Sequence, residues 1–166
     1  FILTIDGPIP KLNLDIIKKI SHSYPIRLNF LKENIGLALA LNNALELVQT
    51  EWIARADSDD INLNQRFEKQ LKFTNKNIGV IGSNILEIDK YTNLPNLTKN
   101  IPLTDYEIKE YIKLRNPINH MTALYKTQLI RDVGGYPNIY LREDYALWAK
   151  LVYKGVVFMN IDEILV

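Results

Sequence analysis

The chain has 166 residues, which is enough for one ordinary domain and too few for two. Hydrophobic residues make up 47% and charged residues 23%, a globular mixture that argues against a disordered chain. The 20 basic and 19 acidic residues give a net charge of +1, without the basic excess of nucleic-acid-binding proteins. The absence of cysteine excludes disulfides and cysteine zinc sites, and no apolar run approaches the roughly 20 residues of a transmembrane helix.

In the first half of the chain, apolar residues recur with the periods of alternating strands and helices. Runs rich in β-branched residues predict strands at residues 1–5, 26–31, 52–56 and 79–88. Apolar residues three and four positions apart predict helices at residues 11–23 and 37–48, and a third helix through Phe67, Leu71 and Thr74.

The second half of the chain is less regular. Residues 89–104 are polar and contain proline, which predicts a connection without regular structure. We expect the remaining strands at residues 121–125 and 156–161. The remaining helices are expected at residues 105–114, just before Gly134-Gly135, and from about Glu143 onwards.

This order of elements predicts an α/β fold with a mostly parallel central sheet flanked by helices. In such sheets ligands bind beyond the carboxyl ends of the strands. Asp6 follows the first predicted strand, and the acidic stretch ARADSDDINL, residues 54–63, includes the end of the third. The sequence therefore predicts two acidic sites at one edge of the sheet.

Three aspartates fall within four positions of this acidic stretch. In an extended backbone Asp57 and Asp59 point the same way, while Asp60 points to the other side. Two converging carboxylates repel each other, and a cation such as Mg²⁺, which binds one or two carboxylates together with substrate phosphates, relieves that repulsion. The alternative is an acidic loop that caps the next helix, with Asp60 near the helix N-terminus.

Two other uses of the acidic stretch can be compared with its spacing. An EF-hand loop that begins at Asp57 would have suitable acids at Asp59 and Glu68. It would lack a ligand at Ile61 and the glycine at Asn62, and a predicted strand precedes it where an EF-hand has a helix. A phosphohydrolase would use Asp57 as nucleophile and Asp59 as acid, but normally after the first strand of its fold.

The helix predicted from Glu143 carries a second pair of acids. Asp144 lies on the same face as the apolar residues Leu147, Trp148 and Leu151, and Glu143 lies roughly 100° around the helix. One interpretation is a negative charge that stabilises the helix N-terminus. The other is a general base held by a rigid helix. The spacing does not decide between them.

Several residues near these acids have both a structural and a functional interpretation. His120 could contact a sugar or phosphates, although a hydrogen-bonded structural histidine is the more common case. Trp148 is expected to pack in the core because it lies on the apolar face of its helix. At least one of three arginines is expected to pair with the acidic motifs: Arg55, Arg66 or Arg142.

Five segments, in this order and spacing, resemble the family-2 glycosyltransferases, which are inverting nucleotide-sugar enzymes with a GT-A fold. The segments are LTIDGP, NIGLALALNNALE, WIARADSDDINLNQRFEKQLKF, NPINHMTALYK and VGGYPNIYLREDYALWAKLVYKG. They look like the Asp-Gly strand end, the Asn-x-Gly loop and helix, the Asp-x-Asp motif, and the segments before and around the Glu-Asp motif. The pattern is most similar to bacterial enzymes that build surface polysaccharides.

For the donor, the resemblance implies a nucleotide-sugar, expected to be a UDP-sugar, and a divalent metal, Mn²⁺ or Mg²⁺. Asp59, the second acid of Asp-x-Asp, would bind the metal that bridges the diphosphate. Asp57 would support the metal or contact the ribose and sugar, and Ser58 would lie between the two acids in the donor site. Asp6 would accept a hydrogen bond from the nucleotide base. Two residues would line the same pocket, Asn34 and Gly36.

For the acceptor, the resemblance implies a saccharide, free or lipid-linked, and a carboxylate base. Asp144 would deprotonate the acceptor hydroxyl, and Glu143 would be its neighbour and the less expected base. His120 is a further candidate for contact with the substrate. The enzyme would be a hexosyl- or N-acetylhexosaminyltransferase, cytoplasmic or peripheral at the inner face of the cell membrane.

The resemblance also bears on the extent of the domain. The family normally has a strand and helix before FILTIDG and a C-terminal region that shapes the acceptor site. We therefore expect residues 1–166 to be a single incomplete GT-A domain without these parts. Two alternative functions are a non-catalytic module that binds a nucleotide sugar or metal, and a metal-dependent phosphohydrolase.

Overall fold

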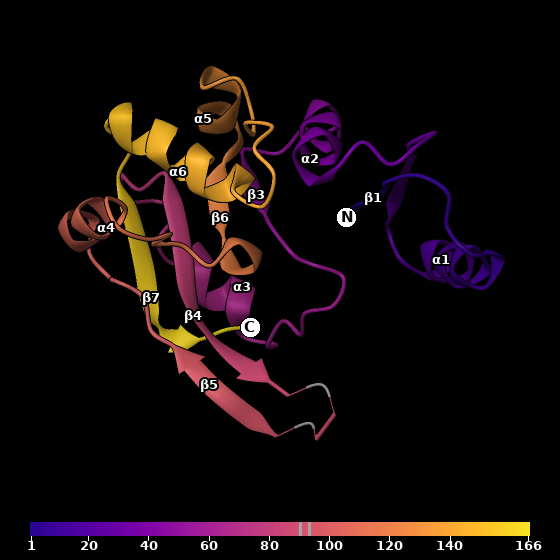
Figure 1. Cartoon of the computed structure of the whole chain (residues 1–166), viewed down its shortest axis with the longest axis horizontal. Coiled ribbons are helices and arrows are strands. Elements are labelled where there is room, and N and C mark those ends of the chain that lie inside the picture. Colours follow the sequence, from indigo (N-terminus) through magenta and orange to yellow (C-terminus); the bar gives the residue numbers. More distant parts are fainter. Residues whose placement is uncertain (90, 93) are drawn as a thin grey trace.

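The computed structural model describes residues 1–89, 91–92 and 94–166, which form two sheets flanked by helices. In the smaller sheet, β1 (Ile2–Ile5) and β2 (Arg27–Phe30) pair in parallel. Helix α1 (Lys11–Ser23) connects them and lies at the right of Figure 1. A crossover of this kind is needed because parallel neighbours start at the same end of a sheet.

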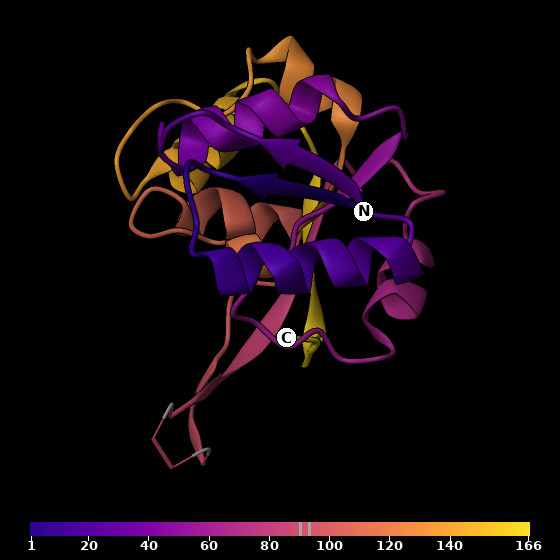
Figure 2. The same cartoon turned by 90° about the vertical axis from the view of Figure 1, so that its right-hand side faces the viewer.

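The larger sheet is built around its longest strand, β4. Its strands are β3 (Trp52–Ala54), β4 (Val80–Ile88), β5 (Pro95–Lys99), β6 (Leu124–Lys126) and β7 (Phe158–Ile164). The order is β3-β6-β4-β5, and β7 pairs with β4 in parallel, while the other three pairings are antiparallel. In the side view of Figure 2, β4 and β5 extend beyond the helices.

Helices cover both faces of the larger sheet. They are α2 (Leu37–Glu46), α3 (Arg66–Leu71), α4 (Asp105–Tyr111), α5 (Thr127–Asp132), α6 (Glu143–Tyr153) and the short 3₁₀ helix η1 (His120–Thr122). No helix among the described residues is long and apolar enough to cross a membrane.

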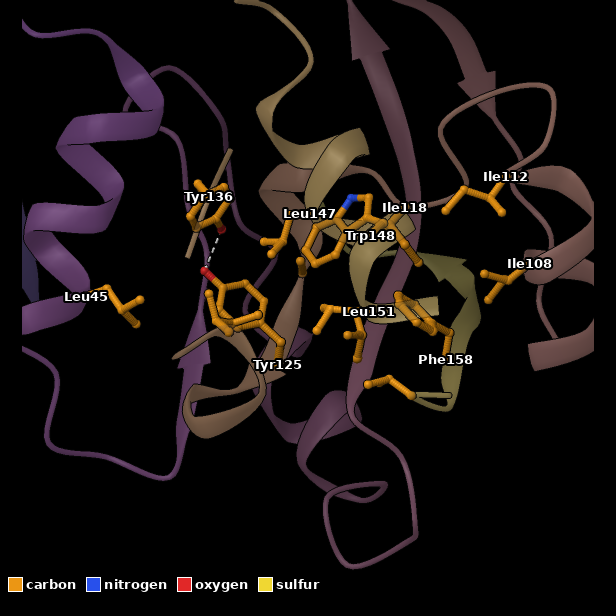
Figure 3. Packing of buried hydrophobic residues seen from close by; sticks show 14 of the residues in the cluster. Leu45, Ile108, Ile112, Ile118, Tyr125, Tyr136, Leu147, Trp148, Leu151 and Phe158 are labelled. Carbon is orange, nitrogen blue, oxygen red and sulfur yellow. Dashed lines mark hydrogen bonds between the residues drawn. The ribbon is translucent and has the colours of Figure 1, made fainter. Parts of the chain in front are cut away.

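The alternation of side chains along the strands divides the core into two clusters. Val80 faces the larger cluster, which includes residues of α2, α4, α5 and α6. The next residue of β4, Ile81, faces the smaller cluster, which includes Phe73 just after α3. Figure 3 shows the larger cluster around Trp148, which is fully buried. The predicted packing role of Trp148 is therefore confirmed.

The predicted α/β class, a central sheet flanked by helices, is confirmed, and the structure adds the direction of each pairing. Parallel pairing holds for β1–β2 and β4–β7, whereas three pairs are antiparallel, so the central sheet is mixed rather than mostly parallel as expected. The prediction that residues 89–104 lack regular structure is wrong, because Pro95–Lys99 pairs with β4. This strand lies at the edge of the sheet and pairs only with β4. An edge strand does not need the alternating apolar residues by which a strand is recognised in a sequence.

A buried arginine holds the loop that follows β3. Arg66 in α3 is fully buried and donates from Nη2 to the carbonyl oxygens of Arg55 at 2.8 Å and Ala123 at 3.4 Å. Its Nε donates to Gln70 Oε1 at 3.1 Å, and its Nη1 bonds Asn62. Burial lowers the pKa of Arg66 to about 10. One guanidinium thus fastens both ends of the acidic loop to the sheet.

Replacing Arg66 with Met should lower the free energy of unfolding by about 3 kcal/mol, because buried carbonyl oxygens lose their donors. Lys72→Met is the control, since the exposed Lys72–Glu68 pair should contribute no more than about 0.5 kcal/mol. Urea unfolding of the two variants measures the difference. Equal losses in both would contradict the anchoring role of Arg66.

Candidate active site

Asp6, directly after β1, holds the loop that enters α2. Its Oδ1 accepts a hydrogen bond from the Ile35 N–H at 2.8 Å, and its Oδ2 accepts one from the Gly36 N–H at 3.0 Å. Gly7 makes room for this loop, since a Cβ there would lie 2.6 Å from the backbone nitrogen of Asn34. The structure thus brings together three predicted pocket residues, Asp6, Asn34 and Gly36.

The loop after β3 gathers the acidic cluster. Asp57 forms an ion pair with Arg55, so the predicted pairing of an arginine with this motif is confirmed. Burial raises the pKa of Asp57; Arg55 opposes this, and the charges of Asp59 and Asp144 add to it. Burial also raises the pKa of Asp60, with the charges of Asp57 and Asp59 contributing. The four carboxylates therefore act on one another.

The exposed turn of Ser58 and Asp59 is chemically suited to a divalent cation. Carboxylate oxygens are ligands that Mg²⁺ and Mn²⁺ prefer, and a cation would offset the repulsion between Asp57 and Asp59. Within the described ranges, no group of three or more His, Cys, Asp or Glu side chains is placed to hold a metal. A cation held by these two aspartates would complete its coordination with water and substrate phosphates.

The second pair of acids begins α6, at the residue predicted from the sequence. Asp144 Oδ2 accepts a 2.6 Å hydrogen bond from Asn116 Nδ2, and its Oδ1 accepts one from the Tyr145 N–H at 2.7 Å. Asn116 Oδ1 is itself bonded to the Ile118 N–H at 3.2 Å, which orients the amide. Asp144 is half-buried and held from two sides, whereas Glu143 is buried at 9% exposure.

Asp144 lies within electrostatic reach of the loop after β3, because its charge contributes to the raised pKa of Asp57. This proximity joins two segments that are far apart in the sequence. Asp6 and its loop belong to the smaller sheet, so the predicted site residues lie in two parts of the structure. One part contains Asp6, and the other contains Asp57, Asp59 and Asp144.

His120 lies in the core. It is 8% exposed, and its Nε2 is 3.0 Å from the hydroxyl of Tyr136. Tyr136 is in turn hydrogen-bonded to the hydroxyl of Tyr125 at 2.7 Å, as Figure 3 shows. Burial lowers the pKa of His120 to about 3, and Arg55 contributes. His120 is therefore neutral and hydrogen-bonded, and its contact with a substrate stays a prediction.

Comparison with known proteins identifies the chain. Residues 1–146 match the protein family described as Glycosyl transferase family 2. The chain belongs to this family. The resemblance predicted from its five sequence segments is therefore confirmed.

Relatives of this family-2 chain include named bacterial proteins. It is 30% identical over 166 residues to the Amylovoran biosynthesis glycosyltransferase AmsE of Erwinia amylovora, covering 99% of this chain and 62% of AmsE. It is 40% identical over 138 residues to the UDP-Gal:alpha-D-GlcNAc-diphosphoundecaprenol beta-1,3-galactosyltransferase of Escherichia coli, covering 82% of this chain and 50% of that protein. The chain thus spans between half and two thirds of the length of these relatives.

Solved glycosyltransferases share the fold of this family-2 chain. TarS 1–349 of S. aureus in complex with UDP-GlcNAc aligns with a TM-score of 0.73 at 18% identity, covering 98% of this chain and 46% of the TarS 1–349 chain. The mannosyltransferase PcManGT of Pyrobaculum calidifontis, in complex with GDP-Man and Mn²⁺, aligns with a TM-score of 0.70 at 14% identity, covering 98% and 45%. These likenesses confirm the GT-A fold class.

The sequence analysis did not single out Asn116, which is hydrogen-bonded to Asp144. Asn116 lies in the segment NPINHMTALYK, but its amide was not among the predicted site residues. Its partner Asp144 is 28 positions away, so no local pattern signals the pair. The bond between Asn116 Oδ1 and the Ile118 N–H resembles the local turns that asparagine often forms, which was the available signal.

His120 should make folding sensitive to mild acid. Its folded pKa, about 3, lies below the ordinary 6.5, so the unfolded chain binds one more proton between these values. This contribution to stability is fully present above pH 6.5 and is lost as pH falls, by about 1.4 kcal/mol per pH unit. His120→Gln should flatten the dependence between about pH 6.5 and 5, as measured by urea unfolding.

The exposed His22 provides the matched control for this measurement. His22→Gln should keep the slope of the unsubstituted protein. A slope in His120→Gln as steep as in the unsubstituted protein would show that His120 is not buried in its neutral form.

Proposed function

We propose that the protein is an inverting glycosyltransferase that moves a sugar from a UDP-sugar to a saccharide acceptor during synthesis of a bacterial surface polysaccharide. The observation that carries the proposal is that Asn116 and the Tyr145 N–H hold Asp144 at the start of α6, while Asp57 and the exposed Asp59 follow β3. This arrangement supports a carboxylate that acts as base and a pair of carboxylates that serves a diphosphate and its cation.

On the donor side, Asp6 and its loop receive the nucleotide. Both Asp6 oxygens are bonded to backbone N–H groups, and each keeps lone-pair capacity for a further donor such as the N–H of a base. Asn34 and Gly36 line the same pocket. Asp59 holds the divalent metal, supported by Asp57, and when bound the metal offsets the negative charge that grows on the leaving diphosphate.

On the acceptor side, Asp144 accepts the proton of the attacking hydroxyl. The acceptor oxygen bonds to the anomeric carbon as the bond from that carbon to the diphosphate oxygen breaks, and the configuration inverts. Asn116 and the Tyr145 N–H hold both Asp144 oxygens, so the free lone pair has a fixed direction. A base positioned in this way contributes about 10²- to 10⁴-fold to the rate.

The substrate classes follow from proteins that share the family or fold. TarS was solved with UDP and with UDP-GlcNAc, and the relative from Escherichia coli is named for UDP-Gal and a diphosphoundecaprenol acceptor. We assign this protein a UDP-linked hexose or N-acetylhexosamine donor and a free or lipid-linked saccharide acceptor. A lipid-linked acceptor places it at the inner face of the cell membrane as a peripheral protein.

Asp59→Ala and Asp144→Asn should separate donor binding from chemistry. In calorimetric titration of UDP with Mn²⁺, Asp59→Ala should weaken binding by about tenfold or more, and EDTA should weaken it in the unsubstituted protein. Asp144→Asn should bind UDP within about twofold of the unsubstituted protein but lose transfer by about 10²- to 10⁴-fold. Asp15→Asn, an exposed change on α1, should affect neither property.

Metal-dependent UDP binding that survives in Asp59→Ala would remove Asp59 as the metal ligand. Full transfer by Asp144→Asn would remove Asp144 as the base. Metal-dependent UDP binding without transfer to any of a broad panel of acceptors would instead favour a non-catalytic nucleotide-sugar module.

Asn116→Ala should lower kcat by about tenfold while the KM for the donor stays within about twofold, because only the orientation of the base is lost. Asn116→Asp should lower kcat further, because it places a second carboxylate against Asp144. Initial rates over a range of donor concentrations measure both constants. Arg115→Ala, at the exposed neighbouring residue, is the control, and a raised KM with unchanged kcat would contradict the role of Asn116.

A further inference from the structure

The side chain of Asn42 joins α2 to the loop that leads into α6. Its Nδ2 donates to the carbonyl oxygen of Tyr136 at 2.8 Å, and its Oδ1 accepts from the Tyr136 N–H at 2.7 Å. One amide therefore engages both backbone hydrogen-bonding groups of a residue 94 positions away. Neighbouring β-strands hold each other by the same kind of paired bond, which fixes direction as well as position.

The space beside this pairing is kept free by Gly135. A Cβ at this position would lie 2.3 Å from Asn42 Oδ1 and 3.0 Å from its Cγ. Gly135 also has a φ of 75°, a left-handed conformation that glycine adopts without steric cost. The loop backbone thus approaches Asn42 more closely than any other residue at position 135 would allow.

Tyr136 is fixed at its other end as well. Its buried hydroxyl is 2.7 Å from the hydroxyl of Tyr125 and 3.0 Å from His120 Nε2. The His120 ring packs edge-on near Trp148, at 6.1 Å between ring centroids, and Trp148 lies one turn after Asp144 on α6. Tyr136 is therefore held by α2 at its backbone and by the core beneath α6 at its hydroxyl (Figure 3).

The N-terminal end of α2 belongs to the predicted donor pocket. Asp6 holds the N–H groups of Ile35 and Gly36 immediately before the helix begins. Asn42 lies in the middle of the same helix, which spans Leu37–Glu46. A single rigid element thus contacts the donor pocket at its start and the loop before the proposed base along its length.

The bonds that hold Tyr136 also bear on the position of the following segment, residues 137–142, which leads into α6. Tyr140 is 87% exposed and Leu141 is 76% exposed, so the segment has little packing of its own. Leu141 also has a φ of 56°. A residue other than glycine keeps this conformation only where its surroundings impose it.

We infer that Asn42 is a positioning residue, which sets the placement of Asp144 relative to the donor pocket by fastening Tyr136 to α2. The role of Asp144 rests on the proposed function, whereas the fastening does not. Loss of the Asn42 amide frees residues 137–142 and shifts the start of α6 without removing any contact to the donor. A displacement of about 1 Å at a reacting group can lower a rate by about 10²-fold.

Asn42→Ala and Asn43→Ala form a matched pair of variants on one helix. Asn43 is exposed and accepts a 2.8 Å hydrogen bond from Asn29 Nδ2, so each change removes one hydrogen-bonded amide. In hydrogen exchange on the natural-length protein, Asn42→Ala should speed exchange of residues 137–146 by about tenfold, and Asn43→Ala should not. In transfer assays only Asn42→Ala should lower kcat, by about tenfold or more, with the donor KM within about twofold.

The two measurements separate the possible failures. Unchanged exchange at residues 137–146 in folded Asn42→Ala overturns the fastening, and faster exchange with unchanged kcat overturns the positioning role. Absence of transfer by the unsubstituted protein overturns the proposed function, while the exchange comparison still decides the fastening. If Asn42→Ala does not fold, Asn42→Asp keeps the acceptor and loses the donor, and unchanged exchange in that variant overturns the inference.

Discussion

Repulsion among the carboxylates after β3 is the constraint on which the rest of the site depends. Asp57, Asp59 and Asp60 lie within four positions; burial raises the pKa of Asp57 and of Asp60, and the charge of Asp59 adds to both shifts. Arg55 offsets part of this negative charge by pairing with Asp57, and the buried Arg66 holds the loop through a hydrogen bond to the carbonyl oxygen of Arg55. Burial and the charge of Arg55 lower the pKa of Arg66, so the two cations also repel each other. The loop keeps its shape because backbone carbonyl oxygens hold Arg66 in place.

Asp6 follows a strand of the smaller sheet, whereas Asp57 and Asp59 follow a strand of the larger sheet, and the placement of these two parts of the proposed site depends on α2. Among the described residues, β1 pairs with β2, and no strand of the larger sheet pairs with either of them. Helix α1 has no buried residue, whereas α2 buries Ala38 and Leu45 against the larger core. Because α2 contacts both parts, it sets their position relative to each other. The Asn42–Tyr136 hydrogen bonds matter because they attach this helix to the loop before α6.

Features with a local cause could be predicted from the sequence, and features with distant partners could not. The bounds of α1 and the start of α6 at Glu143 were correct, because apolar periodicity and acidic first-turn residues mark them within the segment itself. The strand Pro95–Lys99 was missed, because an exposed edge strand needs no apolar alternation. The acids were predicted as site residues from their positions at element ends, and their roles remain predictions. Asn116 was missed because its bond to Asp144 exists only after folding.

The two acids of Asp-x-Asp are not equivalent in this fold, and the difference explains which of them suits a cation. Asp57 is half-buried and already paired with Arg55, so a cation that used it would have to compete with the guanidinium. Asp59 lies on the exposed turn two residues later, where ligand exchange with water and phosphates is open. Asp57 then serves best as the fixed charge that draws the cation toward its neighbour. This difference in exposure and pairing supports the proposal that Asp59 holds the metal, the role that the family resemblance implies for it.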